Sequence, residues 1–228
     1  APGAGARTRR NPTGMKLTVF SALLAAALLT ACHVSSAQPE AVSLPSVVKP
    51  ATATPPLVLA ARQQIGATHL YDPAYVGLSY PGGDVPMERG VCTDVVVRAL
   101  RTQGLDLQQA IHEDMRAHFQ DYPQQWGLKR PNPNIDHRRV PNQMRWFERK
   151  GWAQATNSNA ADYAAGDIVA WKLAGSGLLH IGIVSDRKAR NGTPLIIHNI
   201  GSGTQEEDLL FKHTIIGHYR PKLRVQEY

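Results

Sequence analysis

The hydrophobic pattern changes period in the last third of the chain, and this change limits the chain to an α+β fold. Before it, four segments are predicted to be helices, residues 57–65, 90–104, 107–119 and 143–150, from helical spacing of apolar residues around Val95 to Leu100 and from Gly and Pro at segment ends. After it, short runs rich in β-branched residues are separated by Gly, Asn and Pro at 167–173, 180–186, 195–200 and 215–219. Helices followed by strands predict an α+β domain, with the helices packed on an antiparallel sheet.

The stretch 121–140, between the third and fourth predicted helices, shows neither period. A long irregular stretch in a compact domain usually serves as a binding loop or a lid. We therefore expect it to form one polar wall of a substrate cleft. Because loops are commonly polar, a solvated loop is the alternative. The side chains expected to form this wall are Tyr122, Trp126, Lys129, Arg130, Asp136, His137, Arg138 and Arg139.

The first 56 residues have the composition of an export leader and a tether. From Met15, a charged Lys16 precedes the apolar run 17–29, which has the length of a secretory signal and is too short to span a bilayer. The run ends in Leu-Thr-Ala-Cys at Cys32, which looks like the lipidation site of bacterial lipoproteins; a plain signal peptide is the alternative. Residues 33–56 are rich in Pro and Ala and predict an extended linker. We therefore expect a leader at 1–32, a linker at 33–56, a globular domain at 57–220 and a tail at 221–228.

The formal charge of +7 lies mostly outside the predicted domain. Residues 1–56 contain five basic residues against Glu40, and the tail contains Lys222 and Arg224 against Glu227, so residues 57–220 retain only +2. A nearly neutral domain without a basic stripe does not have the electrostatic footprint of a nucleic-acid-binding protein. We expect no nucleic-acid partner, and contact with a membrane only through the N-terminal lipid.

Cys92 is the residue most suggestive of chemistry. With Cys32 assigned to the leader, Cys92 has no disulfide partner in an exported chain. It lies in the first turn of a predicted helix, where backbone amides and the helix dipole favour a thiolate. His180 and His198 lie on neighbouring predicted strands, so nucleophile, base and orienting group can meet. Each of the three residues is more often structural when taken alone.

Several motifs resemble those of the NlpC-type branch of papain-like cysteine peptidases and amidases. They are Tyr80-Pro-Gly-Gly, Gly90-Val-Cys-Thr-Asp, Gly166-Asp-Ile-Val, His180-Ile-Gly-Ile-Val and Ile197-His198. More narrowly, four stretches resemble the bacterial family of domains of unknown function numbered 1287, over about residues 57–220. These are Gly83-Asp-Val-Pro, Ile111-His-Glu-Asp-Met, residues 134–142 and His198-Asn-Ile-Gly.

The resemblance implies a papain-like fold with Cys92 as nucleophile, His180 as general base and His198 as the group that orients it. Tyr80 would line the site or the oxyanion region. The family usually has Ser-Gly after the cysteine, where this chain has Thr93-Asp94. A carboxylate facing the thiol would raise the thiol's pKa. We therefore expect Asp94 to turn onto a backbone amide, Arg138 or Arg139.

The resulting hypothesis is a periplasmic, lipid-anchored cysteine hydrolase that cleaves an amide bond in peptidoglycan or its stem peptides, without a cofactor or metal. His33 after Cys32 is consistent with sorting to the outer rather than the inner membrane. One alternative is a non-catalytic wall-binding lipoprotein that keeps the papain-like cleft. Another is a zinc site built from His180, His198 and either Asp136 or His137. Imidazole and carboxylate are ordinary zinc ligands, but the spacing of these residues does not by itself indicate a zinc site.

Overall fold

A computed structural model describes residues 53–223. The predicted leader with Cys32, most of the linker and the end of the tail lie outside these residues. Within them, none of the helices is long and apolar enough to cross a bilayer.

The four predicted helices are present, with small shifts at their ends. They are α1 Pro56–Arg62, α2 Cys92–Arg101, α3 Leu107–His118 and α4 Val140–Arg149. Pro56 opens α1, where a missing N–H costs nothing, and Asp106 caps α3 by accepting from the Gln108 amide at 3.1 Å. The fourth helix begins at Val140, three residues earlier than predicted. Pro141 lies within its first turn, a position that tolerates proline because the N–H there has no partner within the helix.

The sheet has five antiparallel strands in the order β6-β5-β4-β3-β7. The four predicted strands correspond to β3 Ile168–Lys172, β4 Leu179–Lys188, β5 Pro194–Asn199 and β7 Thr214–Tyr219. The edge strand β6, Thr204–Glu207, was not predicted, since Thr-Gln-Glu-Glu has little of the apolar alternation that marks a strand. Two short parallel strands, β1 Leu70–Tyr71 and β2 Arg89–Gly90, also pair in a stretch expected to be a loop.

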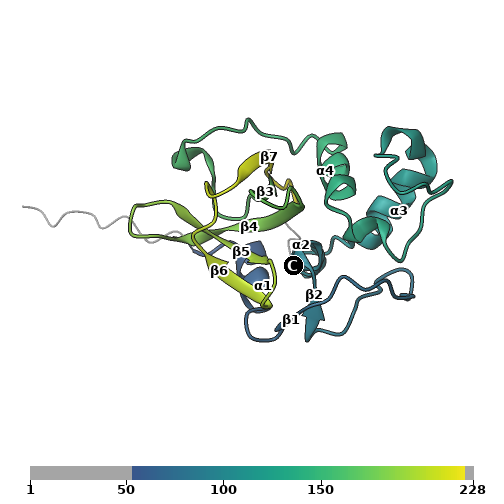
Figure 1. The fold of residues 1–228 in the computed structure, drawn as a ribbon, viewed down its shortest axis with the longest axis horizontal. Coiled ribbons are helices and arrows are strands. Elements are labelled where there is room, and N and C mark those ends of the chain that lie inside the picture. The colour runs from purple at the N-terminus through teal and green to yellow at the C-terminus, as the bar shows by residue number, and fades with distance from the viewer. Residues whose placement is uncertain (1–52, 224–228) are drawn as a thin grey trace, which may run out of the picture. The chain divides into compact units, whose positions relative to one another are not determined.

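The two faces of the sheet belong to two separate apolar clusters. On one face, α1 and α2 pack against β4 and β5, α4 packs against β4 and β7, and α3 packs on α2 and α4 (Figure 1). Cys92, Ile181 and Ile183 lie in the cluster on this face. On the other face, Trp171 and Val184 belong to the second cluster. The predicted α+β architecture, with helices on an antiparallel sheet, is confirmed.

The stretch 121–140 is only partly the open loop that its sequence predicts. Tyr122 is buried and donates its hydroxyl to Asp114 at 2.6 Å, and residues Asp136–Arg138 form a buried 3₁₀ turn. Trp126, in contrast, remains partly exposed. The segment is therefore anchored at both ends and offers one aromatic side chain between them.

Candidate active site

Cys92 lies in the first turn of a helix, as predicted; it is the first residue of α2 and is 4% exposed. The backbone N–H groups of Ile181, Thr93 and Cys92 itself act on the sulfur and favour its anion. Burial outweighs them and raises the pKa of the thiol to about 12. The expectation that the helix N-terminus favours a thiolate is therefore wrong for this resting state, because desolvation of the charge dominates.

Asp94 turns its carboxylate away from the sulfur, onto both kinds of partner that the sequence suggested. One oxygen accepts from the Val91 amide at 2.7 Å. The guanidinium of Arg138 also binds both oxygens, each at 2.9 Å. This carboxylate still contributes to the raised pKa of Cys92, since its charge lies close to the thiol.

His180 and His198 meet in a buried pair. Nε2 of His180 lies 3.0 Å from Nδ1 of His198, and the rings are nearly perpendicular, with centroids 5.0 Å apart. The indole of Trp171 lies beside His180, at 5.9 Å between centroids. Burial, followed by the nearby His198 and His213, lowers the pKa of His180 to about 3. The pair is therefore neutral at physiological pH, with Nδ1 of His180 left for another partner.

A carboxylate extends the pair to a third residue. Nε2 of His198 lies 3.1 Å from Oε2 of Glu207, at the end of the unpredicted strand β6. Burial lowers the pKa of His198, and the charge of Glu207 opposes that effect. Glu207 was not predicted as a site residue, because the polar strand that carries it was not recognised.

Cys92 and the histidine pair come to the same end of the sheet from its two faces. Side chains alternate along β4, so His180 faces the side of Val184, whereas Cys92 packs on the side of Ile181. The amide of Ile181, directly after His180, is one of the three backbone amides that act on the sulfur. Within residues 53–223 the sulfur makes no hydrogen bond to either imidazole. The His180 side chain thus lies on the opposite face of β4 from Cys92, although the Ile181 amide next to it in the chain faces the sulfur.

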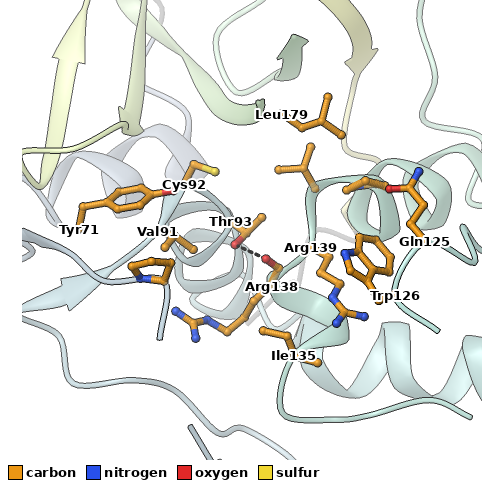
Figure 2. Close-up of a pocket in the computed structure, with 13 residues that line it drawn as sticks. Tyr71, Val91, Cys92, Thr93, Gln125, Trp126, Ile135, Arg138, Arg139 and Leu179 are labelled. Atoms are coloured by element: carbon orange, nitrogen blue, oxygen red, sulfur yellow. Dashed lines mark hydrogen bonds between the residues drawn. The ribbon is translucent and has the colours of Figure 1, made fainter. Parts of the chain in front are cut away.

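The sulfur borders a cavity of about 270 Å³ between α2, α4 and the stretch 121–140 (Figure 2). Four residues expected in the site line it together with Cys92, namely Thr93, Trp126, Arg138 and Arg139. Several lining residues were not predicted, and these are Tyr71, Pro73, Val91, Gln125, Ile135, Val140, Pro141 and Leu179. The cavity is therefore bounded by apolar and cationic side chains together.

Trp126 and Arg139 form the wall opposite the thiol. The guanidinium of Arg139 lies 4.0 Å from the centre of the Trp126 ring, a favourable cation–π distance. Asp136 does not line the cavity but pairs with Arg139 from behind at 3.4 Å. His137 is also buried behind the wall, and burial lowers its pKa to about 4. Asp136 therefore supports the wall through Arg139, and neither Asp136 nor His137 lines the cavity.

Tyr71, and not Tyr80, is the tyrosine at the site. Tyr80 lies edge-on against His112 of α3 and does not line the cavity, so its predicted place in the oxyanion region is wrong. The chain between Tyr80 and α2 turns back to form β2, which pairs with β1 and brings Tyr71 to the thiol instead. In Figure 2 the hydroxyl end of Tyr71 points toward Cys92. Burial and the nearby Cys92 raise the pKa of that hydroxyl.

The residues proposed as zinc ligands do not form a common site. In residues 53–223, no group of three or more His, Cys, Asp and Glu is arranged to hold a metal ion. His180 and His198 turn nitrogens toward each other, while Asp136 lies against Arg139.

Comparison with known proteins assigns the chain to a family. The family model for a domain of unknown function, DUF1287, matches residues 58–221 of the sequence. The chain belongs to the DUF1287 family. It is also 64% identical over 160 residues to the uncharacterized protein YijF of Escherichia coli (strain K12), covering 70% of this chain and 78% of that protein. No solved structure matches the chain.

The DUF1287 match contains every residue of the candidate site. Cys92, the histidine pair, Glu207 and the lining of the cavity all fall within residues 58–221. Neither the family description nor the name of YijF states a substrate or a reaction. The chemistry of this DUF1287 domain therefore has to be argued from the geometry of its site.

Proposed function

We propose that this DUF1287 domain is a papain-like cysteine hydrolase of the cell envelope that cleaves an amide bond in peptidoglycan or its stem peptides. The observation that carries the proposal is the 3.0 Å bond between His180 and His198, at the end of the sheet where the amide of Ile181 faces the sulfur of a cysteine at a helix N-terminus. A base oriented by a second polar group next to a nucleophile is the arrangement that covalent hydrolysis of amides needs.

The proposed reaction begins from a neutral thiol. When substrate binding brings Nδ1 of His180 to the sulfur, Sγ of Cys92 attacks the carbonyl carbon while its proton passes to Nδ1, so that no isolated thiolate forms in the buried site. The backbone amides around the sulfur and the hydroxyl of Tyr71 would stabilise the developing oxyanion. His180 then protonates the leaving amine as the C–N bond breaks. Water hydrolyses the thioester with His180 as base, which restores the thiol.

The location of the proposed substrate follows from the leader. A signal with a lipidated Cys32 would tether the domain in the periplasm, with the outer membrane favoured, where peptidoglycan is within reach. The cavity accepts a narrow chain, since 270 Å³ is near the lower end of the range for small-molecule sites. A peptide stem fits that volume better than a folded protein.

The proposal is tested by release of soluble fragments from purified sacculi. Wild-type chain should release them, and C92A should abolish release while shifting the melting temperature by no more than a few degrees, about what a small cavity costs. Y80F serves as a matched control that leaves release unchanged, since Tyr80 lies away from the cavity. Equal release by C92A and wild type would rule out Cys92 as nucleophile.

One observation favours a second candidate, a non-catalytic wall-binding domain. The thiol is buried, its pKa is raised to about 12, and no imidazole is bonded to it among the described residues. Under this alternative, sacculi are bound but never cleaved, and C92A binds as well as wild type. A co-sedimentation assay run beside the release assay separates the two functions. Binding without release by the wild type supports the alternative.

A further inference from the structure

The three polar side chains at the end of the sheet form one continuous chain of hydrogen bonds. Nε2 of His180 meets Nδ1 of His198 at 3.0 Å, and Nε2 of His198 meets Oε2 of Glu207 at 3.1 Å. The two histidines are buried, whereas the Glu207 side chain is 45% exposed. The chain of bonds therefore runs from the buried base to a carboxylate in contact with water.

The register of the strands explains why Glu207 reaches His198. His198 is paired with Gln205 across the β5–β6 ladder, and Glu207 lies two residues further along the same face. Such diagonal neighbours lie within reach of a long side chain. Glu206, between them, points to the other face and binds Arg62 and Ser185. Only the carboxylate of Glu207 is thus available to the imidazole.

The carboxylate fixes which nitrogens carry protons. An ionised carboxylate only accepts hydrogen bonds, so Nε2 of His198 must be its donor. A neutral imidazole has one N–H, so Nδ1 of His198 is then the acceptor and Nε2 of His180 must donate to it. Nδ1 of His180 is consequently left without a proton. That is the nitrogen at which the proposed mechanism needs a lone pair.

Without the carboxylate, the opposite arrangement becomes equally possible. His198 can then carry its proton on Nδ1 and donate it to Nε2 of His180, which forces the proton of His180 onto Nδ1. In that form His180 cannot accept the thiol proton. The other titratable group facing the pair is His213, which precedes β7 and acts on both rings. His213 receives the amide of Ala174 on its own Nδ1 and makes no hydrogen bond to either histidine within the described chain.

We propose that Glu207 is a positioning residue that selects the Nε2–H form of both histidines and so leaves Nδ1 of His180 free to act as the base. This inference rests on the proposed hydrolase function. Glu207 itself takes no proton in the reaction, because one proton moves from Sγ of Cys92 to Nδ1 of His180. Its negative charge also favours the imidazolium that forms when the proton arrives.

The direct test reads the protonated nitrogens by NMR and does not depend on hydrolysis. In full-length chain labelled with ¹⁵N-histidine at pH 7.5, we expect His180 and His198 both to carry their proton on Nε2. Glu207→Ala should move a measurable fraction of both rings to the Nδ1–H form. Asp208→Ala is the matched control, since this neighbouring carboxylate makes no hydrogen bond among the described residues. Unchanged ring protonation in Glu207→Ala overturns the inference.

A kinetic readout separates this inference from the proposed function. If the wild type releases wall fragments, Glu207→Ala should lower kcat by about tenfold or more at unchanged KM, because a misplaced proton disables the base without altering the cavity. Its melting temperature should match that of Asp208→Ala. If Glu207→Ala changes the ring protonation but the wild type releases no wall fragments, the hydrolase function is refuted and the role of Glu207 in placing the protons stands. Full activity in Glu207→Ala would refute the positioning role and keep the hydrolase.

Discussion

Arg138 and Asp94 form a two-point ion pair inside the protein, with Nε to Oδ1 and Nη2 to Oδ2 both at 2.9 Å. Their side chains are only 2% and 3% exposed. Arg138 also donates to the carbonyl oxygen of Ala74, so one guanidinium joins the start of α2 to the segment that follows β1. The pair therefore holds the walls of the cavity as well as the helix that begins with the thiol.

Removing Arg138 should destabilise the fold strongly. Arg138→Met leaves Asp94 as an unpaired buried charge, and such a loss costs about 3–5 kcal/mol. Arg145→Met is the matched control, because the Arg145–Glu148 pair is exposed and worth at most about 1 kcal/mol. Urea unfolding of the two variants measures both values. Similar free energies of unfolding for the two would mean that the buried pair contributes no more than a surface one.

The resting thiol should react slowly. Since burial raises the pKa of Cys92 to about 12, little thiolate exists at pH 7.5. We expect iodoacetamide to modify Cys92 in the folded protein about tenfold or more slowly than in urea, with peptide mapping to distinguish it from Cys32. Rapid modification at pH 6 would instead indicate a preformed thiolate. Thiol reactivity in the unliganded protein therefore does not separate the hydrolase from the wall-binding alternative.

Acidification should weaken the fold below neutral pH. The pKa values of His180 and His137 are lowered to about 3 and 4, against about 6.5 in an unfolded chain. As pH falls through 6.5, the unfolded chain takes up protons that these buried rings cannot, so stability is lost toward lower pH. Between pH 7.5 and 5.5 each ring should cost about 1 kcal/mol.

Urea unfolding at the two pH values measures this loss. His180→Gln should remove its own share of the pH dependence, while His69→Gln, which changes an exposed ring, should leave it intact. Equal stability at pH 7.5 and 5.5 would contradict the prediction.

The two tyrosines near the helix α2 should differ in their importance for activity. Tyr71→Phe removes the hydroxyl that points at Cys92 and should lower kcat for wall cleavage by about tenfold, as expected for one oxyanion donor in a partly exposed site. Tyr80→Phe should leave kcat unchanged, since its ring rests on His112. The release assay with equal amounts of each variant decides between them. A lower kcat for Tyr80→Phe than for Tyr71→Phe would mean that Tyr80, and not Tyr71, acts in the site.

The sequence predicted the elements of this fold where local pattern was strong. Helical spacing around Val95, Val96 and Leu100 marked α2, and β-branched runs marked the central strands. It missed β6, whose residues are polar because an edge strand has one side open to water. Glu207, the last residue of that strand, was therefore not predicted as a site residue. Its role depends on a cross-strand register that no local pattern encodes.

The site was predicted best where it depends on position along the chain. The placement of Cys92 in the first turn of a helix follows from nearby sequence, and the contact of Asp94 with Arg138 follows from the need of a carboxylate near a thiol for a cationic or amide partner. Tyr71 could not be distinguished from Tyr80, since the β1–β2 pairing that selects it joins residues about twenty apart. The protonated state of the thiol was also mispredicted. Burial is a property of the whole packed domain and outweighs the local helix effect.

Gly182 lies two residues after His180 on β4 and against His198 of β5, and its missing side chain sets a limit on how this site can vary. A Cβ atom there would lie 2.7 Å from Cγ2 of Ile196, closer than real Cβ contacts allow, and 3.0 Å from Cβ of His198, which is tighter than most. Any larger residue would force β5 away from β4 and part the imidazoles. Homologous chains that keep the histidine pair should therefore keep glycine at this position, and a sequence survey that finds alanine or serine there should find the second histidine replaced as well.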